Sequence, residues 1–263
     1  MVDLTGKTVL VTGASSGLGE QLALAVAAKG ANVVLTARRQ ERLTKVADQC
    51  RILSAAQAVG IKCDLGHVSE IERLFEQVDQ LFSGVDIVIN AAGFGTFTPA
   101  MKMTYATTEK MLRVNTLAVM LVSQLAAQRM SRVGHGEIVN IASIAGKVAT
   151  PKSAVYAATK AAVIAYDNAL RLELKPAGVN VMTVNPGPIN TDFFKTADPS
   201  GQYLATVARL ALNPVQLAEV IVSKLGRHQR ELNRPRMMAA ANLGYQLAPK
   251  LGDWLAGTVF NFK

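Results

Sequence analysis

The stretch KTVLVTGASSGLGEQLALAVAAKG, residues 7–30, decides the fold of this 263-residue chain. Residues 7–12 are largely apolar and predict a buried strand, and residues 17–30 predict a helix. The turn between them carries glycines at positions 13, 17 and 19. Glycine suits a sharp turn whose backbone must approach a pyrophosphate, and the N–H groups of the following helix start can bind that anion. The turn therefore predicts a nucleotide site, although its spacing is not G-x-G-x-x-G.

The rest of the chain alternates in the same way. Further strands are expected at residues 32–37, 59–65, 85–93, 136–143 and 178–187, and helices at residues 40–57, 68–82, 107–132 and 153–174. Apolar strands that alternate with helices form a parallel sheet covered on both faces. We therefore expect an α/β fold, a doubly wound, Rossmann-like parallel sheet, in a single domain spanning residues 1–263.

Composition limits the class of protein. Half of the residues are hydrophobic and 18% are charged, which is typical of a globular chain. The N-terminus has no signal-peptide pattern, and no run of 18 apolar residues is present to span a membrane. The two cysteines form no disulfide framework, so a cytoplasmic location is expected. The three histidines stand in no metal-ligand pattern, so no metal site is expected.

The net charge of +9 is concentrated near the end, where residues 224–263 hold seven basic and two acidic residues. A solvated basic surface is the first interpretation, and attraction to an anionic substrate or a membrane surface is the second. Nucleic acid is not expected as a partner, because no aromatic residues interleave the basic ones.

The C-terminal part has two further features. A substrate lid is expected at about residues 188–212, and a helical segment at about 237–263, which Pro249 and Gly252 should divide. The helical segment carries an apolar stripe at Leu243, Leu247, Leu251, Leu255 and Val259. In decreasing order of preference, this stripe is expected to pack on the domain's own core, on a second subunit or on a membrane surface.

The end of the second strand discriminates between dinucleotide cofactors. An acidic residue there would hold a free ribose 2′-hydroxyl, whereas a basic residue would accommodate a 2′-phosphate. This chain has Arg38 and Arg39 at that place and no acid. The sequence therefore predicts NADP(H) over NAD(H), with Arg38 as the better candidate because it comes first after the strand. Two arginines in a surface loop are the alternative interpretation.

Tyr156 and Lys160 stand one helical turn apart in the alanine-rich segment 153–174, so their side chains share a face. A nearby ammonium favours the phenolate and lowers the pKa of a tyrosine, which can then exchange a proton with a substrate oxygen. The pair alone is a weak pattern. However, ligands of a doubly wound sheet bind beyond the carboxyl ends of its strands, and Ser143 ends the strand before this helix. These three residues therefore predict a catalytic site.

Further motifs follow the glycine turn in order. They are Asp64 after the third strand, Asn90-Ala91-Ala92-Gly93 after the fourth, Asn115, Ser143, Tyr156 with Lys160, and Pro186-Gly187 with Thr191. With this set, the chain resembles the short-chain dehydrogenase/reductase family over residues 5–192. Two departures are visible: Ala157 replaces the commoner serine after the tyrosine, and the fourth-strand motif has a single asparagine. Neither removes a group that the chemistry needs.

The resemblance implies roles for these residues. Tyr156 would be the catalytic acid/base, and Lys160 would lower its pKa and bind the nicotinamide ribose. Ser143 would hold the substrate oxygen, and Asn115 would support a water in the proton relay. Asp64 and Leu65 would touch the adenine, and Thr191 would hold the carboxamide. The full implied set of cofactor contacts is Gly13, Ser15, Ser16, Gly17, Leu18, Gly19, Arg38, Arg39, Asp64, Leu65, Asn90, Ala91, Gly93, Tyr156, Lys160, Pro186, Gly187, Ile189 and Thr191.

The implied activity is an NADP(H)-dependent oxidoreduction between a carbonyl and an alcohol, with carbonyl reduction as the expected direction. The apolar side chains expected around a small-molecule substrate are Phe94, Phe97, Met101, Phe193, Phe194 and Tyr203. Members of the family commonly form dimers or tetramers, so a homo-oligomer is expected. Two alternatives remain open: a sensor that keeps the fold and cofactor without catalysis, and a membrane-surface reductase of lipid-like carbonyls.

Overall fold

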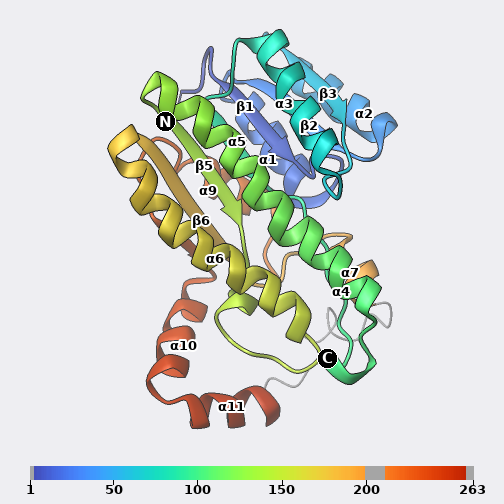
Figure 1. The fold of residues 1–263 in the computed structure, drawn as a ribbon, viewed down its shortest axis with the longest axis vertical. Coiled ribbons are helices and arrows are strands. Elements are labelled where there is room, and N and C mark those ends of the chain that lie inside the picture. The colour runs from blue at the N-terminus through green and yellow to red at the C-terminus, as the bar shows by residue number, and fades with distance from the viewer. Residues whose placement is uncertain (1–2, 199–210, 259–263) are drawn as a thin grey trace.

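The structure is a computed structural model that describes residues 3–198 and 211–258. One seven-stranded sheet runs through it in the order β3-β2-β1-β4-β5-β6-β7, with neighbouring strands parallel (Figure 1). The strands are β1 (Thr8–Thr12), β2 (Asn32–Ala37), β3 (Ala58–Lys62), β4 (Ile87–Asn90), β5 (Gly136–Ile141), β6 (Val179–Pro186) and β7 (Glu231–Arg234). The predicted doubly wound parallel sheet is confirmed, and its strand order reverses between β1 and β4.

Helices cover both faces of the sheet (Figure 1). The buried residues of α1 (Gly17–Ala27), α2 (Gln40–Leu53) and α9 (Pro214–Val222) share one apolar cluster with one face. Those of α3 (Val68–Phe82), α5 (Ala118–Val133) and α6 (Ala154–Leu174) share a second cluster with the other face. The remaining helices are α4 (Tyr105–Leu112), α7 (Phe193–Ala197), α10 (Arg236–Leu247), α11 (Pro249–Thr258) and the short turns η1 (Ala100–Lys102), η2 (Arg113–Leu117), η3 (Ile144–Gly146) and η4 (Lys175–Ala177).

The alternation of side chains along β1 shows why these strands are apolar throughout. Val9 and Val11 pack in the first cluster, whereas Leu10 packs in the second. Successive side chains of a strand point to opposite faces, and here both faces are covered by helices. All three side chains are fully buried.

Two expected helices end or break earlier than their sequences predict. The helix expected at 40–57 ends at Leu53, because Ser54 takes an extended conformation and its hydroxyl accepts the N–H of Ala56. The helix expected at 107–132 is interrupted by the π turn η2, with α4 before it and α5 after it. Within this turn Asn115 is fully buried.

The sequence pattern does not predict α9 or β7. The start of α9 had a readable signal, since Asn213 caps it by accepting the N–H groups of Val215 and Gln216, and Pro214 occupies the first turn. β7 reads ELNR, which has no apolar periodicity, and only its pairing with β6 makes it a strand. The single domain and the lid at about 188–212 stay predictions. Tyr203 lies outside the described residues.

The expected division of the C-terminal helical segment is half right. The break falls at Ala248, and Pro249 begins α11. Gly252 does not break the helix. It lies inside α11, where a Cβ would overlap the Tyr245 ring of α10, so the glycine lets the two helices approach. The Tyr245 hydroxyl also donates to Asp253 over 2.7 Å, which joins α10 to α11.

The expectation that the apolar stripe packs on the domain's own core is wrong. Leu243, Leu247 and Leu251 are 57%, 78% and 57% exposed. The physical reason is visible in Figure 1, where α10 and α11 extend away from the sheet instead of folding over it. Val259 lies outside the described residues. A second subunit or a membrane surface therefore remain as the predicted partners of this stripe. No described helix combines the length and hydropathy needed to cross a membrane.

Candidate active site

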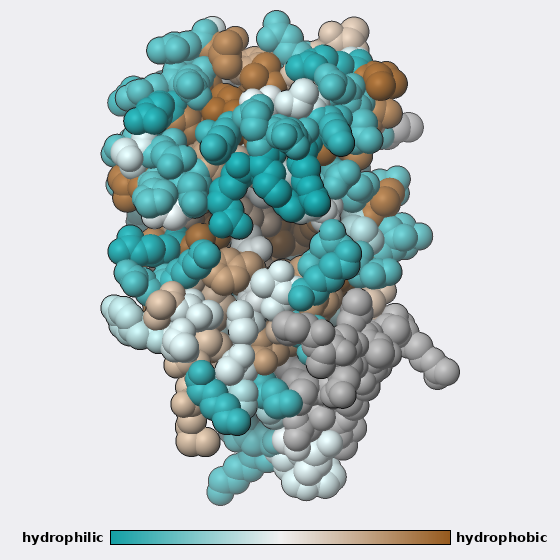
Figure 2. All heavy atoms as spheres, turned by 90° about the vertical axis from the view of Figure 1, so that its right-hand side faces the viewer, coloured by the Kyte–Doolittle hydropathy of each residue, from teal (hydrophilic) through white to brown (hydrophobic). Residues whose placement is uncertain are grey.

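A cavity of about 1140 Å³ lies at the carboxyl ends of the central strands. Its wall includes residues that follow β1, β2, β4, β5 and β6, which is the place where doubly wound sheets bind ligands. In the space-filling view the surface is hollowed near its middle, with hydrophilic residues around the rim and hydrophobic residues within (Figure 2). The cavity is therefore large enough for an elongated ligand and has two chemically different parts.

The glycines of the turn allow main-chain segments to pack closely beside the cavity. Gly13 has a φ of +69°, and a Cβ there would lie 2.7 Å from the Ala92 Cα. A Cβ at Gly19 would overlap the Gly13 carbonyl group. No side chain caps the start of α1, so its first N–H groups face the turn that lines the cavity. The turn is thus built for an anion held by main-chain N–H groups.

Arg39 closes one side of this turn. Its Nη2 donates to the hydroxyls of Ser15 and Ser16, both over 2.9 Å. Burial lowers the pKa of Arg39, and the positive charges of Arg42 and Arg38 lower it further. Both Arg38 and Arg39 line the cavity, and Arg39 is the one whose guanidinium bonds to the loop. An anion here would relieve the repulsion among these cations.

Asp64 and Leu65 line the next part of the wall. The Asp64 carboxylate accepts the N–H of Gly66 over 2.9 Å, and its own N–H donates to Glu70 over 2.7 Å. These bonds fix the loop after β3. His67 is exposed and also lines the cavity.

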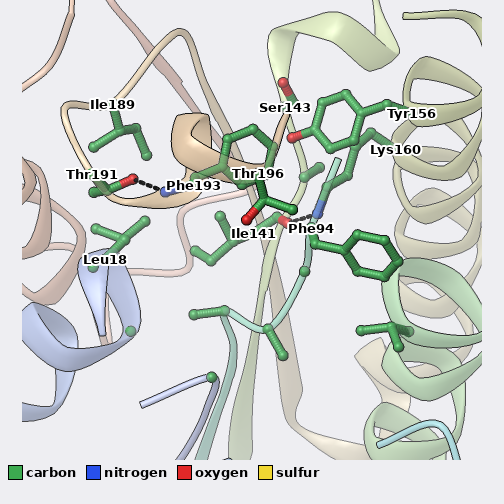
Figure 3. Close-up of a pocket in the computed structure, with 18 of the residues that line it drawn as sticks. Leu18, Phe94, Ile141, Ser143, Tyr156, Lys160, Ile189, Thr191, Phe193 and Thr196 are labelled. Atoms are coloured by element: carbon green, nitrogen blue, oxygen red, sulfur yellow. Dashed lines mark hydrogen bonds between the residues drawn. The ribbon is translucent and has the colours of Figure 1, made fainter. Parts of the chain in front are cut away.

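Ser143, Tyr156 and Lys160 converge on one wall of the cavity (Figure 3). Figure 3 shows the Ser143 and Tyr156 side chains next to each other, with the Lys160 ammonium turned toward Ile141. Ser143 Oγ accepts the N–H of Ala145 over 3.1 Å, so the short turn η3 holds it. Lys160 Nζ donates to the Ile141 carbonyl over 2.8 Å and lies 6.0 Å from the centre of the Tyr156 ring.

The Lys160 ammonium is almost completely buried, with 4% of the residue exposed. Burial lowers its pKa to about 8, and the negative charge of Asp167 opposes this change. A lysine with such a pKa is still largely an ammonium near neutral pH. It can therefore act on a neighbouring phenol through its charge.

Asn90 and Asn115 lie behind the cavity wall. The Asn90 amide donates to Asn140 Oδ1 over 2.8 Å inside the core. The Asn115 amide donates to the Phe94 carbonyl over 2.8 Å and accepts the Phe94 N–H over 3.0 Å. Asn115 thus fixes the main chain after β4. A Cβ on Gly93 would lie 3.4 Å from Lys160 Nζ, so this chain segment passes directly over the lysine.

The other expected contact residues lie on the wall of the cavity. They are Gly17, Leu18, Ala91, Gly93, Pro186, Gly187, Ile189 and Thr191. Thr191 Oγ1 accepts the N–H of Phe193 over 3.4 Å, which holds the start of α7. Of the predicted catalytic and cofactor-binding residues, the structure therefore brings all but Asn90 and Asn115 to the cavity surface.

Aromatic side chains surround Tyr156 at the other end of the cavity. Its ring centre lies 5.7 Å from that of Phe193 and 6.4 Å from that of Phe97. Phe94 and Phe194 also line the cavity. Met101 does not: it is 97% exposed in η1, so its expected place in the pocket is wrong. The turn η1 carries it outward, away from the ring cluster.

Sequence reasoning missed three lining residues from the C-terminal helices. Met237, Met238 and Ala256 reach the cavity from α10 and α11. A Cβ on Gly187 would lie 2.8 Å from the Met238 sulfur, which shows how closely α10 approaches the strand end. No local pattern could have placed these residues, because they lie about 50 to 70 residues after the end of β6.

Comparisons with known proteins agree with this arrangement. The sequence model for short chain dehydrogenase matches residues 7–201. An uncharacterized oxidoreductase of Staphylococcus aureus (strain USA300) is 34% identical over 225 residues, covering 86% of this chain and 93% of the relative. A short-chain dehydrogenase from Sphingobium yanoikuyae, solved in complex with NADPH, superimposes with a TM-score of 0.81 at 27% identity, covering 93% of this chain and 94% of the other.

A short chain dehydrogenase/reductase from Burkholderia phymatum, solved in complex with NAD, has a TM-score of 0.87. Its identity to this chain is 21%, and the match covers 95% of this chain and 96% of that one. At this identity the likeness supports the fold alone. The two solved structures carry different nicotinamide cofactors, NADPH in one and NAD in the other.

Proposed function

Since this chain belongs to the short-chain dehydrogenase/reductase family, we propose that it interconverts a carbonyl and an alcohol by hydride transfer, with NADP(H) as its cofactor and Tyr156 as acid/base. The observation that carries this proposal is the convergence of Ser143, Tyr156 and Lys160 on one wall of the cavity. A sensor would have no need of all three groups at one point of a ligand site.

The residues present fit a dinucleotide. The glycine turn and the uncapped start of α1 suit a pyrophosphate, and Gly13 lets this turn pack closely against the main chain of Ala92 after β4. When bound, the nicotinamide supplies or accepts the hydride. Asp64 and Leu65 would bind at the adenine, and Gly93, Ile189 and Thr191 at the nicotinamide half.

The chain's own side chains handle the substrate oxygen. In reduction, the Tyr156 hydroxyl gives its proton to that oxygen, while Ser143 donates a hydrogen bond to it. The Lys160 ammonium stabilises the phenolate that Tyr156 becomes. Asn115 holds the Phe94 main chain, and through it the segment that passes over Lys160. Any water that Asn115 supports would lie beside this segment.

Preference for NADP(H) rests on the cations at the end of β2. Arg39 is already oriented by Ser15 and Ser16, and Arg38 and Arg42 add positive charge beside it. A ribose 2′-phosphate would bring the opposite charge to this cluster. A cofactor that cells keep reduced favours carbonyl reduction as the direction.

The substrate is proposed to be an apolar small-molecule carbonyl compound. The aromatic rings around Tyr156 line the cavity, and so do Met237 and Met238 of α10. Burial of apolar substrate surface against such a wall supplies binding energy without fixing a particular functional group beyond the carbonyl.

The test is turnover with a panel of apolar ketones and aldehydes, measured as NADPH consumption together with alcohol formation. Equal amounts of the two are expected for at least one carbonyl compound. Tight NADPH binding without turnover of any compound would contradict the proposal and favour the sensor. The membrane-surface reductase remains a narrower form of the same function. Its specific support is the exposed stripe on α10 and α11, two helices that also contribute Met237, Met238 and Ala256 to the cavity wall.

A further inference from the structure

A buried carboxylate lies inside the helix that carries the proposed catalytic pair. Asp167, in α6, is fully buried. One carboxylate oxygen accepts the Asn140 amide of β5 over 2.6 Å, and the other accepts the Thr183 hydroxyl of β6 over 2.7 Å. A single side chain thus ties α6 to two strands of the sheet.

This pair of bonds belongs to a longer buried network. Asn140 Oδ1 accepts the Asn90 amide of β4 over 2.8 Å, so the network reaches the strand whose end borders the cavity. On the other side, Arg171 donates to the Thr183 hydroxyl over 2.9 Å and to the Val181 carbonyl over 2.9 Å. The carboxylate of Asp167 is the acceptor at the centre of this chain of donors.

Lys160 and Asp167 stand seven residues apart on α6, which is about two turns, so both point to the same strand. The two residues of β5 that they contact are neighbours in sequence. Lys160 donates to the carbonyl of Ile141, and Asp167 accepts from the side chain of Asn140. The ammonium and the carboxylate therefore hold α6 against the same point of β5, directly under the catalytic wall.

The charge of Asp167 acts on Lys160. Burial lowers the pKa of the Lys160 ammonium and the Asp167 charge raises it, and the balance of the two is a pKa of about 8. Burial raises the pKa of Asp167 to about 6, while its bonds to Asn140 and Thr183 and the charges of Arg171 and Lys160 act in the opposite direction. Between about pH 6 and pH 8, Asp167 is therefore an anion while Lys160 is a cation.

The other titratable side chains around this site are bound to other partners. On α6, the Tyr166 hydroxyl donates to the Met120 carbonyl. Before β7, the Arg230 carbonyl accepts from Arg171, and Lys147 after β5 pairs with Glu231 of β7. The strands themselves present the neutral groups of Asn140 and Thr183 to Asp167.

Within the described part of the chain, the buried carboxylates are Glu137 and Asp167. Glu137 lies at the opposite end of β5 and accepts the N–H of Gly226 over 2.7 Å. It is a matched control, because it is also a buried carboxylate and lies on the strand that Asp167 contacts, but not under the site.

We propose that Asp167 is a positioning residue of this enzyme, whose buried carboxylate anchors α6 beneath the site and holds Lys160 in its ammonium form. The inference rests on the proposed function, since it assigns a device that serves the Tyr156–Lys160 pair. Asp167 is not among the residues that the sequence motifs assign to the catalytic site. At lower pH, protonation of Asp167 would release part of that hold on Lys160.

The test measures the ionisation of Lys160 directly, in the full chain with ¹³C-labelled lysine. The Cε signal of Lys160 is assigned by its loss in Lys160→Met and is followed by NMR from about pH 5 to pH 10. For charges about 10 Å apart at an effective dielectric of about 20, losing the Asp167 charge lowers the Lys160 midpoint by about one pH unit. Asp167→Asn, which keeps the shape, should show this shift, and Glu137→Gln should leave the midpoint unchanged.

An unchanged midpoint in Asp167→Asn, or an equal shift in Glu137→Gln, would overturn the proposal. If Asp167→Asn does not fold, the wild type still decides: its Lys160 signal should show a second inflection near pH 6, where Asp167 titrates. Absence of that inflection would equally overturn it.

Turnover separates this proposal from the proposed function. In Asp167→Asn, the loss of rate at alkaline pH should begin about one pH unit lower than in the wild type. If no protein turns over any carbonyl compound, the proposed function fails while the NMR titration still judges Asp167. If turnover occurs and its pH profile is the same in both proteins, Asp167 does not act through Lys160, and the proposal fails alone.

Discussion

Replacing Arg39 by alanine should weaken binding of NADPH far more than binding of NADH. The Arg39 guanidinium reaches the hydroxyls of Ser15 and Ser16, both at 2.9 Å, and so stands where a 2′-phosphate of a nucleotide on the glycine turn would lie. A hydrogen bond to a charged group contributes about 1.5–3 kcal/mol. Because Arg39 is solvent-exposed, the lower value applies. It corresponds to a loss of about tenfold in NADPH affinity.

Calorimetric titration of both cofactors against the wild type, Arg39→Ala and Arg38→Ala measures this. NADH is the internal control for damage to the glycine turn, since Arg39 also holds the two serines there. Arg38→Ala is the control for general loss of positive charge, and it should weaken NADPH binding less. An equal loss for both cofactors would show that Arg39 merely supports the loop. An unchanged ratio of the two affinities in both variants would refute the 2′-phosphate reasoning.

Three further predictions concern stability and binding. Gly13→Ala should abolish dinucleotide binding and lower the free energy of unfolding by roughly 1–3 kcal/mol, because φ is +69° and the new Cβ would clash with Ala92; Gly134→Ala, with a φ of +76° and open space around it, should leave calorimetric binding intact. Burial raises the pKa of Asp167 from 3.8 to about 6, so the folded chain binds a proton there before the unfolded chain does. Between about pH 7 and pH 4 this residue should therefore raise the free energy of unfolding as the pH falls, by roughly 3 kcal/mol, and urea unfolding should show that Asp167→Asn loses this contribution; the same pH dependence in both proteins would count against it. Leu247→Lys should change the free energy of unfolding by less than about 0.5 kcal/mol, since Leu247 is 78% exposed, and a larger loss on thermal unfolding would show that it packs on the core.

The sheet could be read from the sequence because its signals are local. An apolar β-branched strand such as β1, followed by a glycine turn and an amphipathic helix, carries its own periodicity. The same holds for the Tyr156–Lys160 spacing, which any helix converts into a shared face. Elements stabilised only by their neighbours were missed: β7 has a single apolar residue, Leu232, among polar ones and becomes a strand by pairing with β6.

The site was predictable in its residue types but not in their orientation. Arg38 comes first after β2, yet Arg39 makes the bonds to the loop, because Arg39 is the residue before α2 and its side chain turns back toward Ser15. Asn115 was expected to support a water in the proton relay, and its amide, held in the π turn, bonds to the Phe94 main chain, a contact that the sequence does not predict. The place of Met238 in the cavity wall could not be predicted, because contacts between a C-terminal helix and a distant strand end follow from the tertiary fold.

The measurement that tests the central claim most directly is carbonyl reduction by Tyr156→Phe beside NADPH binding by the same variant. The phenyl ring keeps the contacts with Phe97 and Phe193 and removes only the hydroxyl. We predict that the rate of NADPH-dependent reduction falls by about 10²- to 10⁴-fold, as expected for loss of a general acid, while the dissociation constant for NADPH changes by less than about threefold. Turnover by Tyr156→Phe at the wild-type rate would contradict the assignment of Tyr156 as acid/base and with it the proposed mechanism.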